Sequence, residues 1–336
     1  MNVKKINNPV ISVLMSCYNA EKWLHSSIPS VLNQTFFDFE FIIVNDGSTD
    51  STINIIKNYI DIDSRIILLN KINTGLADSL NAGIQASRGE WIARIDADDL
   101  CEPNRLKSQL IASIKNDKVI FVGSNLLKID LDGIAIKSVN FPTSHSHLVR
   151  NLTTIRKFPA HSSAFYRTTA VRSVGGYRKR INRAEDRDLW LRLSEIGELA
   201  SVPELLVQLR EHPEQISGDG GGRVQTLDST IAVVSYYLRR SGCKDPLNDS
   251  DELFNEFKAW LGKEVDRLDA NGLKSFRRNL RHAFYSNKSL HQRFFSLMIL
   301  IFGNPILSIR MIHQNIFGFN YPKTLALKWQ RRVITK

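Results

Sequence analysis

Short apolar runs alternate with amphipathic stretches through the first 123 residues of the chain. The apolar runs that predict buried strands are residues 10–16, 39–45, 65–69, 91–95 and 118–123. The stretches with helical spacing of apolar side chains are residues 20–33, a segment ending at Tyr59, residues 76–87 and a segment after Pro103. This alternation predicts a mostly parallel sheet with helices on both faces, the doubly wound α/β class.

The pattern changes after residue 123. The turn Asp132-Gly133 separates two short apolar runs and predicts a hairpin, and residues 185–196 predict a strong helix. From about residue 224 the chain has helical periodicity and little strand character. The predicted organisation is a domain at 1–217 with halves at 1–123 and 124–217, a flexible glycine-rich loop at 218–223, and a helical region at 224–336.

Composition narrows the class of protein. The chain has 336 residues, of which 43% are hydrophobic and 24% charged, so it is long enough and apolar enough to form a substantial core. Its three widely spaced cysteines predict no disulfide framework and favour a reducing compartment. The first ten residues lack the apolar core of a signal peptide, and no apolar run reaches the ~20 residues of a membrane span. We therefore expect a cytoplasmic protein.

The net charge of +11 lies in the C-terminal tail, because residues 271–336 hold twelve Lys or Arg and no Asp or Glu. Within this tail, residues 294–302 (FFSLMILIF) are almost wholly apolar and are flanked by cations. That pattern is typical of a helix lying on an anionic membrane surface, here the inner face of the cell membrane. The same pattern is also expected for a helix that packs its apolar face on the first domain and leaves its cations in solvent. Nucleic-acid binding is a further alternative, but the carboxylates described next would repel phosphate, so no nucleic acid is expected.

Polar clusters follow three of the predicted strands, at 16–19, 45–48 and 96–99. In open parallel sheets, ligands bind beyond the carboxyl ends of the strands, so these clusters are candidates for a binding site. No G-x-G-x-x-G follows the first strand, which argues against an NAD or FAD dehydrogenase.

The carboxylates in these clusters have alternative interpretations. Asp46 lies in a D-G-S-T sequence that also suits a simple turn and helix cap. Negative charge is also favourable in the first turn of a helix, which is an alternative explanation for Asp96, Asp98 and Asp99. Three carboxylates within four residues repel one another, however, and D-x-D spacing suits Mg²⁺ or Mn²⁺ shared with a phosphate. An EF-hand is excluded because its sixth-position glycine and distal glutamate are absent.

Several motifs occur together in a recognisable order. The N-terminal ones are VISVLMSCYN at 10–19, VNDGSTD at 44–50, N-x-G-L at 73–76 and LNAGIQASRGEWIARIDADD at 80–99. The later ones are PNRL at 103–106, HSS at 161–163, VGGYR at 174–178, ED at 185–186 with LWLR at 189–192, and LREH at 209–212. In this order the chain resembles family 2 inverting glycosyltransferases of the GT-A fold over roughly residues 8–217. The resemblance is greatest to enzymes of bacterial surface-polysaccharide pathways.

The resemblance implies roles for individual residues. The residues it assigns to nucleotide-sugar binding are Tyr18, Asn19, Asp46, Asn73, Gly75, Arg94, Asp96 and Arg210. Asp98 is assigned to the metal, Mg²⁺ or Mn²⁺, with His212 completing its shell, and Asp46 to the uracil imide N–H. One departure concerns Leu80, where the family often has Arg, so a phosphate or base contact is missing or supplied elsewhere.

The resemblance places catalysis at Glu185 and Asp186, with Asp186 as the general base. Inversion by a single displacement needs one carboxylate to deprotonate the acceptor and no covalent nucleophile. The alternative is a helix-opening pair bridged to Arg183 or Arg187. The implied reaction transfers a hexose or N-acetylhexosamine from a UDP-sugar to a glycan or lipid-linked glycan. A catalytically inert scaffold on the same fold is the other alternative. Trp190, Leu191 and Leu193 are expected to be core residues rather than a sugar platform.

Overall fold

The computed structural model describes residues 8–212, 222–270 and 321–334. By its internal contacts the chain divides into two units, Met1–Ala232 and Val233–Lys336. The predicted glycine-rich loop lies largely outside the described residues, and so does the apolar run at 294–302.

The first unit is built on one nine-stranded sheet with the order β3-β2-β1-β4-β8-β6-β9-β5, to which β7 is added beside β6. The strands are β1 (Ile11–Cys17), β2 (Phe39–Asp46), β3 (Ile66–Lys71), β4 (Trp91–Asp96), β5 (Leu100–Cys101), β6 (Val119–Ile129), β7 (Ala135–Val139), β8 (Phe165–Arg167) and β9 (Glu198–Arg210). The helices of this unit are α1 (Glu21–Leu32), α2 (Thr52–Ile60), α3 (Leu76–Ala86), α4 (Arg105–Ile114), α5 (His145–Thr153), the 3₁₀ turn η1 (His161–Ser163), α6 (Thr168–Ser173) and α7 (Glu185–Leu193).

Strands β1 to β4 are mutually parallel where they pair, as their continuous apolar sequences predict. Beyond β4 the sheet is mixed, because β8 runs antiparallel to both β4 and β6 while β6 and β9 are parallel. The α/β class is therefore confirmed, and its mostly parallel character belongs to the N-terminal half. The predicted hairpin is also present, as the antiparallel pair β6–β7.

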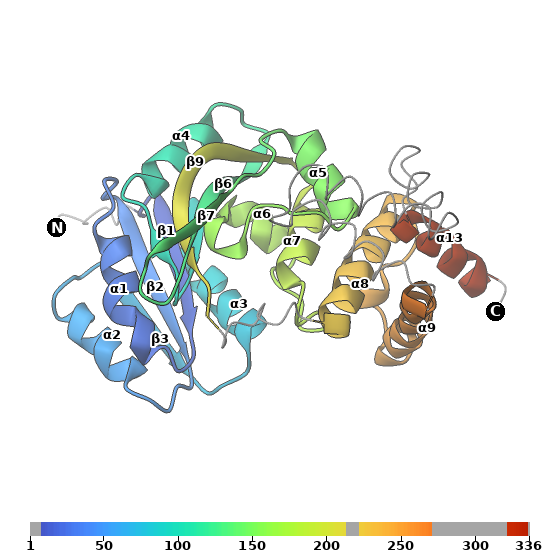
Figure 1. Ribbon diagram of the computed structural model, residues 1–336, viewed down its shortest axis with the longest axis horizontal. Coiled ribbons are helices and arrows are strands. Elements are labelled where there is room, and N and C mark those ends of the chain that lie inside the picture. Colours follow the sequence, from blue (N-terminus) through green and yellow to red (C-terminus); the bar gives the residue numbers. More distant parts are fainter. Residues whose placement is uncertain (1–7, 213–221, 271–320, 335–336) are drawn as a thin grey trace, which may run out of the picture. The chain divides into compact units, whose positions relative to one another are not determined.

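Helices cover both faces of the parallel part of the sheet (Figure 1). The side chains of Ile11, Val13 and Met15 belong to the same buried cluster as Leu24 of α1. The intervening Leu14 points to the opposite face, where α3 approaches so closely that a Cβ at Gly83 would lie 2.1 Å from a Leu14 methyl carbon. A strand buried on both faces is apolar at nearly every position, which explains the VISVLM run. Its one polar residue, Ser12, is buried and donates its hydroxyl to Glu40 at 2.6 Å.

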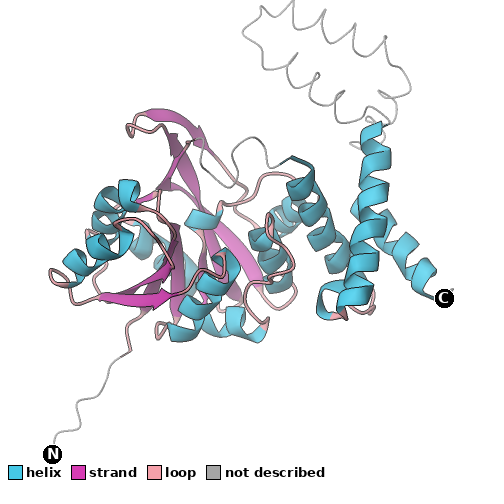
Figure 2. Ribbon diagram, turned by 90° about the horizontal axis from the view of Figure 1, so that it is seen from below, coloured by secondary structure: helices cyan, strands magenta, loops and turns pink. Residues whose placement is uncertain are grey.

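The second unit contains the described helices of the C-terminal region. These elements are the last part of α8 (Gly222–Arg240), the 3₁₀ turn η3 (Pro246–Asn248), α9 (Asp251–Ala270) and α13 (Tyr321–Ile334). The long helices α8, α9 and α13 are drawn as coils in Figure 2. Trp329 of α13 contacts Phe257 and Trp260 of α9, with ring centroids 5.0 and 5.2 Å apart. Lys328 forms an ion pair with Glu264 of α9. The expected helical character of this region is therefore confirmed where it is described. Among the described residues, no helix combines the length and the hydropathy that a membrane span needs.

Candidate active site

The three polar clusters lie at one edge of the sheet because β2 and β4 pair with β1 on opposite sides. Asn19, after β1, has a left-handed backbone with φ of 49°. Its N–H donates to the Ser48 hydroxyl at 3.0 Å, and its side-chain oxygen accepts from the Thr49 N–H at 2.9 Å. Asn19 therefore joins the first loop to the second, while the neighbouring Tyr18 remains 53% exposed.

The carboxylate of Asp46, at the end of β2, is buried and holds the loop at 72–75. It accepts from the Thr74 and Gly75 N–H groups at 3.0 and 2.9 Å and forms an ion pair with Lys71. Burial would raise the pKa of Asp46, but hydrogen bonds led by the one from Lys71 outweigh it, and the pKa is lowered. Gly47 makes the close approach possible, because a Cβ there would lie 2.6 Å from the Asn73 nitrogen.

Arg94 and Asp96 lie two residues apart on β4 and form a bidentate ion pair. Arg94 is 1% exposed, whereas the Asp96 side chain is 35% exposed. Burial raises the pKa of Asp96 on its own, but the adjacent Arg94 guanidinium and His161 reverse this and lower it. Asp96 is therefore an ionised carboxylate at the edge of the site, and its ion pair with the buried Arg94 holds it in place.

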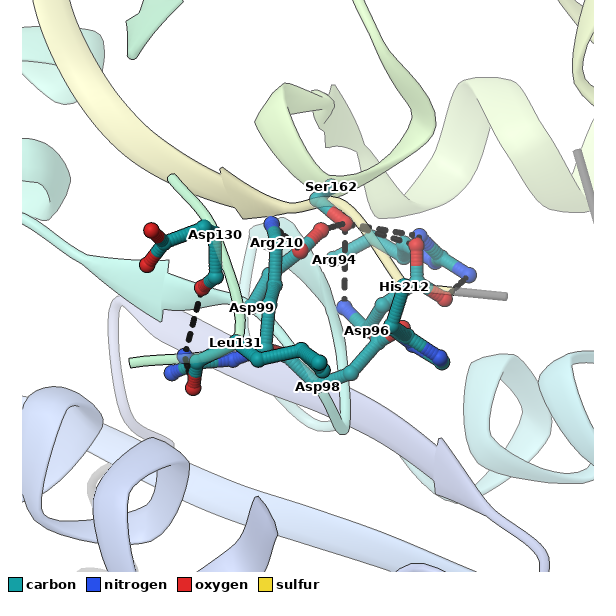
Figure 3. A network of polar contacts seen from close by, with 9 residues as sticks. All are labelled: Arg94, Asp96, Asp98, Asp99, Asp130, Leu131, Ser162, Arg210 and His212. Atoms are coloured by element: carbon teal, nitrogen blue, oxygen red, sulfur yellow. Dashed lines mark hydrogen bonds and ion pairs between the residues drawn. The ribbon is translucent and has the colours of Figure 1, made fainter. Parts of the chain in front are cut away.

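The Ser162 hydroxyl connects this pair to the next loop (Figure 3). Its Oγ lies 2.7 Å from Asp96 Oδ2 and 3.2 Å from Arg94 Nη1, and it also bonds Asp99. Sequence reasoning singled out the HSS segment only as a motif and gave Ser162 no role. The short 3₁₀ turn η1 brings it to the site, and no local sequence signal indicates that placement.

Asp96, Asp98 and Asp99 place carboxylate oxygens within 4.8 Å of one another. Burial raises the pKa of Asp98, and the neighbouring Asp96 adds to the rise. The pKa of Asp99 lies well above its usual range, through burial and the charges of Asp98 and Asp96. The protein partners of the cluster therefore do not fully compensate three ionised carboxylates.

His212, immediately beyond β9, faces this cluster. Its Nε2 lies 2.9 Å from Asp98 Oδ2, and its Nδ1 is buried without a hydrogen-bond partner among the described residues. Two neighbouring ligand atoms that each lie ~2.1 Å from an octahedral metal ion are also separated by about 3 Å. Carboxylate oxygens are the donors that Mn²⁺ and Mg²⁺ prefer, and Mn²⁺ is the softer of the two and accepts an imidazole nitrogen more readily, so these residues fit a divalent metal.

Arg210, at the end of β9, is 5% exposed and anchors the loops of the site. Its backbone N–H donates to Asp99 at 2.9 Å, and its guanidinium donates to the carbonyls of Asp98, Asp130 and Leu131 at 2.9–3.1 Å (Figure 3). These bonds tie the Asp98 loop to the turn that follows β6. A contact from Arg210 to a diphosphate stays a prediction.

Glu185 and Asp186 begin α7, as predicted. Glu185 is 8% exposed, and burial followed by the Asp186 charge raises its pKa to about 8. Asp186 is less buried; burial raises its pKa as well, even though Arg187 opposes the shift. The guanidinium of Arg187 donates to the carbonyls of Leu152 and Arg156 at 2.6 and 3.4 Å, so these side-chain hydrogen bonds go to backbone rather than to either carboxylate.

The residues beside the site that were expected to be structural are buried. Trp190, Leu191 and Leu193 are at most 1% exposed, and Trp190 packs against Phe121 with ring centroids 4.6 Å apart, which confirms a core role. Burial raises the pKa of the Cys17 thiol to about 12, which disfavours a thiolate nucleophile there.

Comparison with known proteins identifies the family. A family model described as "Glycosyl transferase family 2" matches residues 12–175. The chain is 36% identical over 248 residues to a protein named putative glycosyltransferase EpsE from Bacillus subtilis (strain 168), covering 72% of this chain and 86% of that one. It is 29% identical over 269 residues to a hyaluronan synthase of Pasteurella multocida, covering 77% of this chain and 27% of the synthase.

Two solved structures share the fold. The S. aureus TarS 1-349 structure in complex with UDP-GlcNAc has a TM-score of 0.59 and 18% identity, covering 96% of this chain and 91% of that one. The mannosyltransferase PcManGT from Pyrobaculum calidifontis, in complex with GDP-Man and Mn²⁺, has a TM-score of 0.53 and 14% identity, covering 96% and 87%. With the identity to the Bacillus protein, these findings show that the chain belongs to glycosyltransferase family 2 and is a glycosyltransferase.

Proposed function

We propose that this enzyme transfers a hexose or N-acetylhexosamine from a UDP-sugar, with inversion and with a divalent metal, to a glycan or lipid-linked glycan in cell-surface polysaccharide synthesis. The observation that carries the proposal is the crowded carboxylate cluster Asp96-Asp98-Asp99, which His212 faces at the carboxyl edge of the sheet. Such a cluster suits a metal shared with a diphosphate. The TarS structure with UDP-GlcNAc supports the donor class, and the hyaluronan synthase supports a polysaccharide product.

The donor nucleotide is assigned to the loops after β1, β2 and β3. Tyr18 offers an exposed aromatic ring, and Asn19 is held beside it by the second loop. Asn73 is exposed, and Gly75, with φ of 94° and open space at its Cβ position, allows the backbone to approach a ligand closely. Leu80 is fully buried, so the contact that an Arg would make at that position has to come from another residue.

The diphosphate is assigned to the carboxylate cluster. Asp98 and His212 would hold Mg²⁺ or Mn²⁺, which would neutralise the charge that develops on the leaving diphosphate. Asp96 is ionised and partly exposed, which suits hydrogen bonds to the ribose hydroxyls. Ser162 and Arg94 fix the orientation of that carboxylate from beneath the site.

Asp186 is the general base in this proposal, because it is the more accessible carboxylate of the pair at the start of α7. As the acceptor oxygen bonds to the anomeric carbon and the bond to UDP breaks, Asp186 takes the hydroxyl proton. A raised pKa brings it nearer to the pH at which a base works best. Glu185, buried beside it, would act through Asp186 and the start of the helix rather than through the acceptor.

Replacing Asp186 by Asn should lower kcat by about 10²–10⁴-fold, the usual contribution of a general base. The affinity for UDP with Mn²⁺ should change little, because Asp186 lies on the acceptor side. The matched control is Glu204→Gln, which neutralises an exposed carboxylate on β9. Retention of more than half of the wild-type kcat by Asp186→Asn would disprove the assignment.

We also propose that the enzyme is peripheral on the inner face of the cell membrane, with its cationic C-terminal tail on the anionic surface. Of the tail's described cations, Lys328 and Arg332 form ion pairs with α9. The proposal therefore depends mainly on the cations at 271–320, outside the described residues. Binding to vesicles of anionic lipid should be lost in a chain that ends at residue 272; equal binding would contradict it.

The first test of the donor is a thermal-shift series with UDP or GDP, each with and without Mn²⁺. A ligand at ~100 times its Kd stabilises a protein by ~2.7 kcal/mol, which shifts the melting temperature by several degrees. A metal-dependent shift with UDP alone supports the proposal and leads directly to sugar-transfer assays. A shift with GDP alone would overturn the donor, and no shift with either nucleotide would overturn the proposed use of this site.

A further inference from the structure

Trp23 lies on α1 and contacts two side chains of the candidate diphosphate site. Its ring lies 5.0 Å from that of His212, centroid to centroid, with the planes inclined by 34°. The guanidinium carbon of Arg210 lies 5.2 Å from the centroid of the same indole. The Trp23 indole therefore contacts both Arg210, the last residue of β9, and His212, just beyond it. Trp23 itself lies near the N-terminal end of the domain's sequence.

The start of α1 is fixed independently of these contacts. The Ala20 N–H donates to the Thr52 hydroxyl at 2.8 Å, and the Glu21 N–H donates to Asp50 at 3.1 Å. Glu21 in turn accepts from the Ser51 N–H at 2.8 Å. Because the first turn of α1 is bonded to the loop after β2, Trp23 is carried on a rigid support rather than on a free loop.

The polar atoms of Arg210 and His212 point toward the Asp98 loop. Arg210 donates to the Asp98 carbonyl at 3.1 Å, and His212 places Nε2 at 2.9 Å from the Asp98 carboxylate. The guanidinium carbon of Arg210 lies over the Trp23 ring, and the His212 ring is tilted by 34° against the same indole. Cation–π and aromatic contacts of this kind stabilise the same side-chain orientations as the hydrogen bonds to the Asp98 loop. They therefore limit the rotamers that Arg210 and His212 adopt.

We propose that Trp23 is a positioning residue, which holds the imidazole of His212 and the guanidinium of Arg210 in place and so sets the affinity for the metal–UDP complex. The inference rests on the proposed function, since it assigns Trp23 an effect on that same site. Residues that orient metal ligands without touching the metal typically change metal affinity by about 10–100-fold when replaced.

The test uses the full-length protein with Trp23→Phe and Trp23→Leu. Phe keeps an aromatic face for His212 and Arg210, whereas Leu keeps apolar bulk without a π surface. The control is Tyr59→Leu, which removes a partly buried aromatic side chain of α2 that packs on the same core. The Kd of UDP is measured by calorimetry with Mn²⁺, alongside the melting temperature without ligand and kcat and KM for transfer.

We expect Trp23→Leu to weaken UDP binding with Mn²⁺ by about 10-fold or more. Trp23→Phe should stay within about threefold of wild type, and Tyr59→Leu should bind UDP normally even if it melts earlier. Equal affinity in Trp23→Leu and wild type would overturn the inference while leaving the proposed function intact. A loss in Trp23→Leu that Tyr59→Leu matches would also overturn it, because the effect would then be one of stability.

The proposed function fails in a distinguishable way. If the wild-type protein itself shows no metal-dependent binding of UDP, both the proposed donor and the inference about Trp23 are wrong. If Trp23→Leu does not fold, Trp23→Met supplies the comparison, because it also keeps apolar bulk without an aromatic ring. A loss of UDP affinity of about 10-fold in Trp23→Met would support the inference, and wild-type affinity in a folded Trp23→Met would overturn it.

Discussion

The loops after β2 and β4 are equivalent in position, since each follows a strand that pairs with β1, yet their carboxylates differ in how far the protein satisfies them. Asp46 accepts two backbone N–H bonds and an ion pair with Lys71, and its pKa is lowered. Asp98 and Asp99 have raised pKa values, because burial and mutual repulsion exceed the help from their partners. Protein groups therefore compensate the charge of Asp46 in the loop after β2, whereas those of Asp98 and Asp99 in the loop after β4 are only partly compensated, which is what the proposed cation would change.

This difference concerns what each carboxylate contributes to the stability of the protein alone. Asp46 contributes to folding by joining β2 to the loop at 72–75. Ionised Asp98 carries an energetic cost in the protein alone, and the proposed cation would relieve that cost on binding. The comparison therefore predicts opposite responses of activity and stability at the two positions.

The largest effect is expected for Asp98→Ala. Loss of a metal ligand should lower sugar transfer by about 10³-fold, because a metal ion contributes several kcal/mol to transition-state stabilisation. The melting temperature without metal should stay equal or rise, since one repelling carboxylate is gone. Steady-state transfer assays and melting curves check both, with Asp132→Ala, in the turn before β7, as the control. A marked fall in the melting temperature of Asp98→Ala would show that Asp98 stabilises the folded protein as Asp46 does, and would contradict the comparison.

A smaller effect is expected for Asp46→Asn, which keeps one side-chain oxygen but loses the charge that faces Lys71. Breaking this buried, charge-assisted network should lower the free energy of unfolding by about 2 kcal/mol. Asp61→Asn, at an exposed carboxylate after α2, is the control. Chemical denaturation at neutral pH measures the difference.

The sign of the pH dependence sharpens this result. The folded pKa of Asp46 is lower than its unfolded value, so its stabilisation is complete above about pH 4 and is lost as pH falls through the folded pKa. The stability difference between wild type and Asp46→Asn should therefore shrink below about pH 4. A difference that is constant down to pH 2 would show that the charge of Asp46 is not what stabilises the loop.

The smallest effect is the pH dependence of stabilisation by Mn²⁺. The folded pKa values of Asp98 and Asp99 exceed the unfolded values, so without metal a rise in pH from about 4 toward the folded pKa lowers stability. Mn²⁺ removes this loss by binding the ionised carboxylates. Its stabilising effect should grow by up to about 1 kcal/mol per pH unit over that range. Melting curves in Asp98→Ala should show a flatter dependence.

The parallel half of the fold and its loops follow directly from the sequence. The runs that form β1, β2 and β4 are apolar at most positions, so the pattern of apolar residues alone located them and the polar residues at their ends. The order of motifs then assigned Asp46, Asp98 and Asp186 to candidate roles. All three lie where the prediction placed them, at strand ends or at the start of a helix.

The long strand β9 was not predicted. Its sequence, ELASVPELLVQLR, contains a proline and two glutamates and alternates irregularly, and its pairing with β6 contains register shifts. A strand of this kind forms because its neighbours hold it, and its own residues give a weak signal. The consequence is functional, because β9 leads to Arg210 and His212.

The sequence by itself determined the fold class, the position of the carboxylates and the family resemblance, because these depend on local periodicity and on motifs of a few residues. The family resemblance already grouped Asp98 with His212, but only the tertiary structure decided through which contacts the residues of the site meet. Arg210 and His212 meet Asp98 across 112 and 114 residues of chain, and Trp23 reaches both through helix α1. Contacts of such separation depend on strand pairing and core packing throughout the domain, which no local pattern encodes.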